Sequence, residues 1–212
     1  SNVKLILVGD TFQLPSVGPG LVLNDLIESD FFNFIPLNQI YRQSDNSYIP
    51  FLAKEIKNND LSEEFLTKKD DYNFVQVNSD NIKSAIKQIT DLSLKKGLDE
   101  RNVQILAPMY KGEAGIDALN LCLQEIYNPR KRNKEEVIYG DFIYREDDKV
   151  LQLVNDLDNN VFNGDIGYIE NIYTEDGKTV VEINYMGNTV TYRSGEYDKF
   201  NLAYAISIHK SQ

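Results

Sequence analysis

The sequence predicts an α/β fold, built on a parallel sheet into which a small antiparallel β-barrel is inserted. Three strongly apolar runs, Leu5–Val8, Val103–Ala107 and Leu202–Ile208, have the composition of strands that are covered on both faces. Later in the chain, short alternating strands are separated by Glu175–Gly177 and Met186–Asn188, which are strong hairpin-turn signals. Short strands joined by tight turns favour a small barrel.

Apolar residues at helical spacing predict helices between these strands. Two helices are expected at residues 21–27 and 116–126. Another has its buried stripe at Ile49–Ile56 and a cap at Asn46 or Ser47, and a long helix should begin after a cap at Asp80 or Asn81. Further strands are expected at Phe34–Leu37, Phe74–Val77, Lys149–Val154, Val161–Ile169, Ile172–Tyr173, Thr179–Ile183 and Thr189–Tyr192, and residues 209–212 should open a last helix.

The composition is that of an acidic globular protein. The chain has 212 residues, of which 42% are hydrophobic, which suffices for one large domain or two small ones. No apolar run is long enough to span a membrane, and the single Cys122 fits a reducing, cytoplasmic compartment. The net charge of −11, taken alone, argues against a nucleic-acid-binding protein.

The loop after the first apolar run is a candidate nucleotide-binding segment. Ligands of open α/β sheets gather outside the carboxyl ends of the strands, and Asp10 and Gln13 follow the first run directly. The neutral amide of Gln13 can donate to a phosphate oxygen and accept from water at once. On its glycines and prolines alone, however, a plain turn is the favoured interpretation of this stretch.

Arg42 is a second candidate for contact with phosphate. It follows an aromatic residue, Tyr41, just after the short strand expected at Phe34–Leu37. A guanidinium is planar, permanently charged and matched to phosphate oxygens. The alternative for a lone arginine is pairing with a surface carboxylate.

Two loops near the later apolar runs are candidate DNA-binding segments. Pro108–Gly115 lies between a strand and a helix, and in it Tyr110 could stack on a base and Lys111 could meet a phosphate. The alternative is an ordinary connecting loop. Ser207 and His209, the only histidine, end the last apolar run, where a structural role is the alternative.

Other polar clusters give no metal site. The chain has no Cys/His cluster for zinc, and the turn Asn155–Asn160 lacks the glycine and distal glutamate of a Ca²⁺-binding loop. The most basic run, Asn128–Lys134, has no periodicity, so a solvated loop is favoured over a direct DNA contact.

Several of these strings together resemble the RecD-like branch of superfamily 1 DNA helicases, the exodeoxyribonuclease V alpha-subunit/RecD/TraA family. Gly9–Gly20 resembles motif III, Leu37–Gln43 resembles motif IV, and the end of the chain resembles motif V, with Ser207 where relatives usually carry threonine. Ala107–Asn120 resembles the motif that touches the DNA strand. Asp148–Asn155 with Phe162–Gly167 resembles the start of an SH3-like insertion.

The resemblance implies roles for particular residues. Gln13 and Arg42 would be catalytic, reading the γ-phosphate, and Asp10 and Gln212 would join them at the nucleotide. The residues implied in DNA binding are Pro108, Tyr110, Lys111, Gly112, Asn120, Ser207, His209 and Lys210.

The resemblance also implies a domain layout. Residues 1–36 would be the tail of a first RecA-like domain, 37–147 and 200–212 a second RecA-like domain, and 148–199 an SH3-like barrel inserted into it. The fold class expected is therefore a RecA-like parallel sheet domain with an inserted SH3-like antiparallel β-barrel.

The function implied is that of the C-terminal motor portion of an ATP-dependent 5′–3′ DNA helicase or translocase in DNA recombination and repair. No Gly-x-x-x-x-Gly-Lys-Ser/Thr loop is present, so the chain is expected to be an inactive fragment that binds DNA weakly, with ATP and Mg²⁺ used by the full-length protein. Single-stranded DNA and other exonuclease V subunits are the partners implied. Two alternatives are a non-motor DNA-binding subunit of an exonuclease V complex and the helicase part of a conjugative relaxase.

Overall fold

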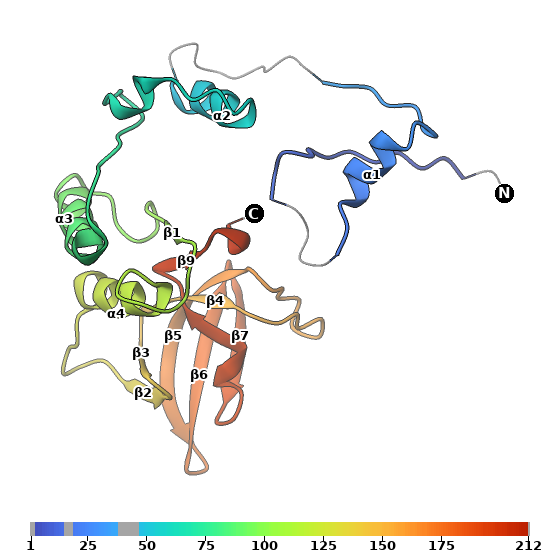
Figure 1. Ribbon diagram of the computed structural model, residues 1–212. Helices are drawn as coiled ribbons and strands as arrows, with labels where there is room; N and C mark the ends of the chain where they lie inside the picture. Colours follow the sequence, from blue (N-terminus) through green and yellow to red (C-terminus); the bar gives the residue numbers. More distant parts are fainter. Residues whose placement is uncertain (1–2, 15–18, 38–46, 212) are drawn as a thin grey trace. The chain divides into compact units, whose positions relative to one another are not determined.

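The computed structural model describes residues 3–14, 19–37 and 47–211 of the chain (Figure 1). These residues form two compact units, 1–76 and 77–212. The division predicted from the sequence, with boundaries at 36, 147 and 199, stays a prediction.

The first unit contains helices and no strand among its described residues. Its elements are α1 (Val22–Glu28), α2 (Ile49–Lys57) and the 3₁₀ helix η1 (Glu63–Leu66), so the two helices predicted here are confirmed. The start of α2 is fixed by Asp71, whose carboxylate accepts hydrogen bonds from the Ser47 hydroxyl at 2.5 Å and from the Tyr48 backbone N–H at 3.1 Å. The hydrogen bond from Ser47 lowers the pKa of Asp71.

The strands predicted at Leu5–Val8, Phe34–Leu37 and Phe74–Val77 are wrong for this structure, since these residues have no strand geometry. The side chains of Leu5–Val8 are 56–88% exposed rather than buried on both faces. A strand has no hydrogen bonds of its own and needs a neighbouring strand to pair with. Within the described part of residues 1–76 no such neighbour is present, so the apolar runs form no strand and stay exposed.

The second unit contains a parallel pair of strands and two helices (Figure 1). β1 (Ile105–Ala107) pairs in parallel with β9 (Ala205–Ser207), which confirms the two predicted runs in part, over three residues each. The predicted helices are present as α3 (Ile82–Lys95) and α4 (Ile116–Tyr127), and α4 packs against both α3 and β9. Leu119 and Leu123 of α4 are completely or almost completely buried in this core.

The strands that follow form an open antiparallel sheet, so the predicted closed barrel is wrong. The strand order is β7-β6-β5-β4-β8, and β7 and β8 are its two edges. The chain between these edges forms a 3₁₀ helix, η3 (Tyr197–Lys199), and β8 pairs with β4 alone. Among the described residues, therefore, no strand pairing between β7 and β8 closes the sheet. The strands are β4 (Lys149–Gln152), β5 (Ile166–Glu175), β6 (Lys178–Tyr185), β7 (Asn188–Arg193) and β8 (Phe200–Leu202).

The two predicted hairpin turns are confirmed. β5 and β6 are joined by Asp176 and Gly177 with φ of 49° and 73°, and β6 and β7 by Met186 and Gly187 with φ of 53° and 94°. Positive φ at both central residues matches the twist of the flanking strands. A separate hairpin, β2 (Glu136–Tyr139) with β3 (Phe142–Arg145), was not predicted.

A buried carboxylate joins the helical part of the second unit to the sheet. Asp148 is completely buried and accepts four hydrogen bonds, from the side chains of Gln124 (2.6 Å), Asn128 (2.7 Å) and Tyr204 (2.9 Å) and from the backbone N–H of Arg145 (2.8 Å). Burial raises the pKa of Asp148, and the donors around it oppose that shift. The ionised carboxylate satisfies all four donors at once.

We therefore expect Asp148→Asn to destabilise the chain by about 2–4 kcal/mol, because an amide has one acceptor oxygen and would turn its NH₂ group toward two of the four donors. Urea unfolding followed by circular dichroism measures the change. The neighbouring Asp147→Asn is the control. The Asp147 side chain is 74% exposed, so this variant should unfold near the wild-type midpoint. Equal midpoints for the two variants would contradict the role of Asp148.

Candidate nucleic-acid interface

The register of the parallel strands brings the two predicted DNA-binding segments to one edge. Ala107 at the end of β1 is the partner of Ser207 at the end of β9. The loop Pro108–Gly115 and the turn η4 (Ile208–Lys210) therefore start side by side, at the carboxyl ends of the strands. This is the edge at which α/β sheets bind ligands.

Glycines shape the loop Pro108–Gly115. Gly112 has φ +98°, and a Cβ on Gly115 would lie 2.5 Å from the Tyr110 carbonyl oxygen, so only glycine fits there without displacing the backbone. The Gly115 N–H donates to the Gly112 carbonyl at 3.0 Å, and the Ile116 N–H donates to the Met109 carbonyl at 2.9 Å. The result is a compact loop, with Tyr110 half exposed and Lys111 exposed.

Lys111 shares its charge with a carboxylate. Its ammonium group lies 2.8 Å from Asp117 Oδ2, in the first turn of α4, and this hydrogen bond raises the pKa of Lys111. The lysine therefore stays protonated, but the neighbouring carboxylate offsets part of its attraction for a phosphate.

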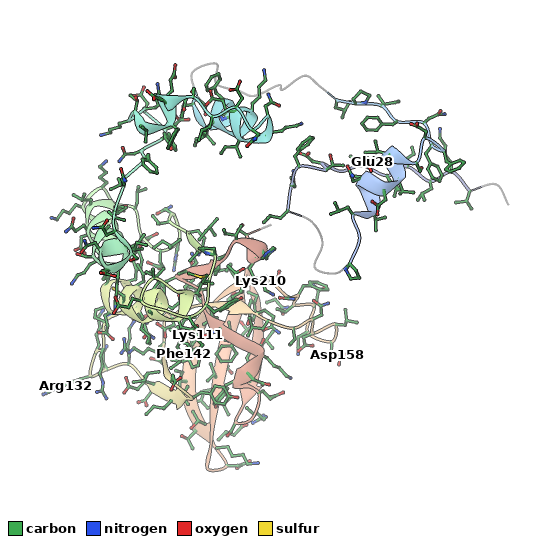
Figure 2. All side chains as sticks on the ribbon, in the orientation of Figure 1. Glu28, Lys111, Arg132, Phe142, Asp158 and Lys210 are labelled. Atoms are coloured by element: carbon green, nitrogen blue, oxygen red, sulfur yellow. The ribbon has the colours of Figure 1, made fainter. Side chains whose placement is uncertain are left out.

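The second segment holds Ser207, His209 and Lys210. Ser207 is buried and its hydroxyl oxygen accepts a hydrogen bond from the His209 N–H at 3.2 Å, which begins η4. The expected helix opening is thus a single 3₁₀ turn within the described residues. His209 is exposed, and the Lys210 ammonium donates to Asn163 Oδ1 in the loop between β4 and β5. Figure 2 labels Lys111 and Lys210 on the two segments.

Asn120 lies behind the edge rather than on it. It is completely buried; its amide NH₂ donates to the carbonyls of Leu202 and Ala205 at 3.0 Å each, and its oxygen accepts from the Ala205 N–H at 2.8 Å. These hydrogen bonds connect α4 to Leu202, which precedes β9, and to Ala205, the first residue of β9. Burial leaves Asn120 no access to a DNA strand in this structure, so we keep the predicted DNA contact for the exposed residues.

The residues predicted to meet a nucleotide are described only in part. Asp10 and Gln13 are exposed; the Asp10 carboxylate accepts from the Phe12 N–H at 3.0 Å, and its carbonyl accepts from the Gln13 N–H at 3.3 Å. This is a tight turn that leaves the Gln13 amide outside. Arg42 and Gln212 lie outside the described residues, so their roles stay predictions.

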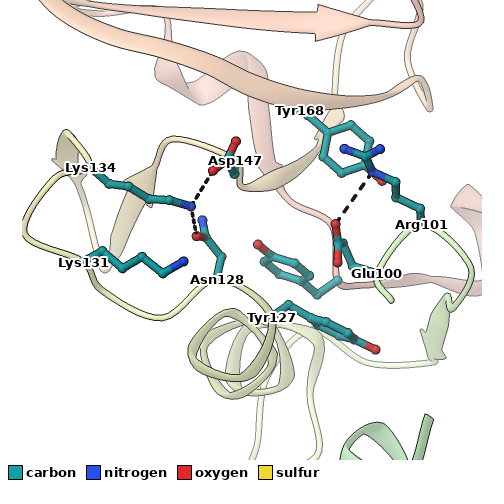
Figure 3. Close-up of a pocket in the computed structure, with 9 residues that line it drawn as sticks. Glu100, Arg101, Tyr127, Asn128, Lys131, Lys134, Asp147 and Tyr168 are labelled. Atoms are coloured by element: carbon teal, nitrogen blue, oxygen red, sulfur yellow. Dashed lines mark hydrogen bonds and ion pairs between the residues drawn. The ribbon is translucent and has the colours of Figure 1, made fainter. Parts of the chain in front are cut away.

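A polar cavity lies at the opposite end of α4 (Figure 3). Its volume is about 280 Å³, and the run Asn128–Lys134, favoured as a solvated loop, contributes three of its residues. Lys134 is only 14% exposed and pairs with Asp147 at 2.5 Å. Because carboxylates accompany the cations here, this cavity offers an anion far less than its basic sequence indicates. The lining residues are Glu100, Arg101, Tyr127, Asn128, Lys131, Lys134, Asp147, Tyr168 and Tyr204.

The described residues contain no group of three or more His, Cys, Asp or Glu side chains arranged to hold a metal ion. Among the helices in the same residues, none has the length and apolar character needed to cross a membrane.

Comparison with known proteins shows that the chain is similar to helicases. A family model described as the ATP-dependent RecD-like DNA helicase SH3 domain matches residues 119–183, and a model of the AAA domain matches residues 1–80. A curated relative, the ATP-dependent RecD2 DNA helicase of Deinococcus radiodurans, is 30% identical over 211 residues, which cover 100% of this chain and 27% of the relative.

The matches among solved structures include Pif1 helicases. The Bacteroides Pif1 helicase in complex with ADP-AlF3 and single-stranded DNA is 21% identical with a TM-score of 0.48, over 96% of this chain and 52% of that one. A structure of two coordinating Pif1 helicases at forked double-stranded DNA is 21% identical with a TM-score of 0.45, over 96% and 50% of the two chains.

The buried amide of Asn120 gives a prediction about the interface. Asn120→Ala should destabilise the second unit by about 2–4 kcal/mol, because it leaves one N–H and two carbonyls unpaired in the core. Urea unfolding measures the loss, and hydrogen exchange at the Ala205 amide should accelerate. Leu121→Ala, on the exposed face of the same helix, is the control. Unchanged exchange at Ala205 in Asn120→Ala would contradict the assignment.

Proposed function

Because the chain belongs to the RecD-like helicase family, we propose that it is the C-terminal motor portion of an ATP-dependent 5′–3′ DNA helicase or translocase acting in recombination and repair. The chain spans 27% of the length of the curated relative that it matches. The reaction, its direction, the pathway and a cytoplasmic location are all part of this proposal.

The parallel pairing of β1 with β9 is the observation that carries the proposal. Its register starts both candidate DNA-binding segments from neighbouring residues, Ala107 and Ser207. A strand that crosses this edge would meet an aromatic ring, backbone amides and cations within one small area. Contacts of this kind hold single strands without reading their sequence.

Each exposed residue of the edge has a chemical role in this proposal. Tyr110 offers its half-exposed ring for stacking on a base, and Lys111 and Lys210 offer ammonium groups to phosphates. His209 is exposed beside them, and Gly112 and Pro108 allow the strand to approach the backbone closely. The contacts are few, so a chain with a net charge of −11 needs the rest of the protein to bind DNA tightly.

The nucleotide belongs to the full-length protein in this proposal. The sequence has no loop that would cradle the α- and β-phosphates of ATP. This chain alone therefore does not fit a complete ATP site. We propose for this chain a role in outer contacts only: Asp10, Gln13, Arg42 and Gln212 would contact the nucleotide in the full-length protein, and Gln13 and Arg42 would read its terminal phosphate.

The DNA edge is tested by Tyr110→Ala and Lys111→Ala in the full-length protein. Loss of the ring should weaken binding to single-stranded DNA by about 1–3 kcal/mol. Loss of the lysine should lower the magnitude of the salt slope of binding by about 0.7. Fluorescence anisotropy with a labelled oligonucleotide measures both. Lys131→Ala, on the basic run at the other end of α4, is the control, and an equal effect in all three variants would contradict the location of the site.

The nucleotide contact is tested by Arg42→Ala in the full-length protein. We expect DNA-stimulated ATP hydrolysis to fall by at least about 10³-fold, the loss typical of an arginine that stabilises the transferring phosphoryl group, while binding of single-stranded DNA persists. The exposed Arg132→Ala is the control. Normal hydrolysis in Arg42→Ala would contradict the assignment. If the unmodified protein binds DNA but does not hydrolyse ATP, it is the non-motor DNA-binding subunit instead.

A further inference from the structure

Residues Phe162–Gly167 form a rigid loop in which the side chain of Asn163 makes no contact that shapes the loop. The Asp165 carboxylate accepts from the Phe162 N–H at 2.7 Å, and the Phe162 carbonyl accepts from the Asp165 N–H at 3.0 Å. Gly164 has φ +106°, and a Cβ on Gly167 would lie 2.7 Å from the side chains of Ile183 and Tyr185. The glycines and the aspartate thus shape the loop, but the side chain of Asn163 takes no part in this.

The backbone of Asn163 is held on the antiparallel sheet. The Asn163 N–H donates to Asn155 Oδ1 at 2.9 Å. On either side of the loop, the Gly164 N–H donates to the Gln152 carbonyl at 2.9 Å and the Gln152 N–H donates to the Asp165 carbonyl at 2.8 Å. Gln152 is the last residue of β4 and is completely buried, so the loop inherits the rigidity of that strand.

The Asn163 side chain reaches the candidate DNA edge instead. Its Oδ1 accepts a hydrogen bond from the ammonium group of Lys210 in η4. The partner is neutral, so Lys210 is oriented without losing its positive charge. Lys111 on the neighbouring loop differs, since it pairs with the carboxylate of Asp117 at 2.8 Å.

From these contacts we propose that Asn163 is a positioning residue, which holds the Lys210 ammonium group ready for a phosphate of the bound DNA strand. The inference rests on the DNA contact of Lys210 that is part of the proposed function. A free lysine side chain samples many rotamers and loses that freedom on binding. The hydrogen bond to Asn163 restricts the Lys210 side chain before DNA binds, so less conformational entropy is lost on binding. Through this contact the antiparallel sheet supports the turn η4.

The choice of asparagine gives the inference its test. Asn163→Ala removes the support and keeps the charge of Lys210, so the affinity for DNA should fall by about 2- to 10-fold with an unchanged salt slope. Asn163→Asp replaces the neutral partner by a carboxylate, which offsets the charge, so the magnitude of the slope should fall by about 0.7, as in Lys210→Ala. Binding of a labelled oligothymidylate to the full-length protein is measured by anisotropy over a range of salt concentrations.

The double variant Asn163→Ala/Lys210→Ala decides whether the two residues act together. If Asn163 acts through Lys210, the double variant should bind as Lys210→Ala does. A further loss in the double variant, equal to that of Asn163→Ala alone, overturns the inference. An unchanged affinity in Asn163→Ala, with a loss in Lys210→Ala, also overturns it but leaves the proposed DNA edge standing. No effect of Lys210→Ala on affinity or slope contradicts the proposed contact and the inference with it.

A structural role of Asn163 is separated by a matched control. Asn171 on β5 also has an amide in one exposed side-chain hydrogen bond, to Glu182 at 2.8 Å. Asn171→Ala removes a comparable bond from the same sheet and should leave affinity and salt slope unchanged. Thermal unfolding of both variants shows whether the sheet is intact, and a matching loss of affinity in Asn171→Ala would overturn the inference.

Discussion

The buried carboxylate of Asp148 is the interaction on which the second unit depends. It receives donors from α4, from the end of β3 and from Tyr204 just before β9, and it is itself the residue that precedes β4. A charge in the interior is tolerated only where donors replace the water it has lost. The four elements must therefore come together in one arrangement for the group to be satisfied, which makes the carboxylate a determinant of geometry as much as of stability.

The candidate DNA edge inherits its geometry from this interior. Asp148 fixes the C-terminal turn of α4 through Gln124 and Asn128, and Asn120 fixes the middle of the same helix to the backbone around β9. With the helix anchored at both places, the loop before it and the turn after β9 have fixed starting points. The side chains of the edge are on the surface, while the polar groups that align their supports, Asp148 and Asn120, are buried.

Part of this fold was predictable because its causes are local. The turns at Asp176–Gly177 and Met186–Gly187 need positive φ, which their residues supply, and the helical stripes of α3 and α4 follow from the spacing of apolar side chains. The strand predicted at Leu5–Val8 was wrong, because a strand depends on a neighbouring strand, and no local sequence pattern reveals whether one is present. The prediction of a closed barrel was wrong for a similar reason. Closure depends on pairing between β7 and β8, whereas a hairpin signal concerns only consecutive strands.

The candidate site was predictable to a different degree at each position. Tyr110, Lys111 and His209 are exposed, and their contact with DNA stays a prediction. The burial of Asn120 could not be read from a string in which it stands beside such residues, because it depends on the packing of α4 against β9. The contact between Asn163 and Lys210 joins residues 47 positions apart, so neither string indicated the other.

The open sheet has one more consequence. In the part of the chain that the structure describes, strand β7 is an edge of the sheet, and such an edge can recruit a strand from another molecule and start aggregation. Here the edge is short, and its outward residues include Thr189, Thr191 and Arg193, the last ion-paired with Glu175 at 2.5 Å. Polar and ion-paired side chains at the edge of a sheet disfavour its pairing with a strand of another copy.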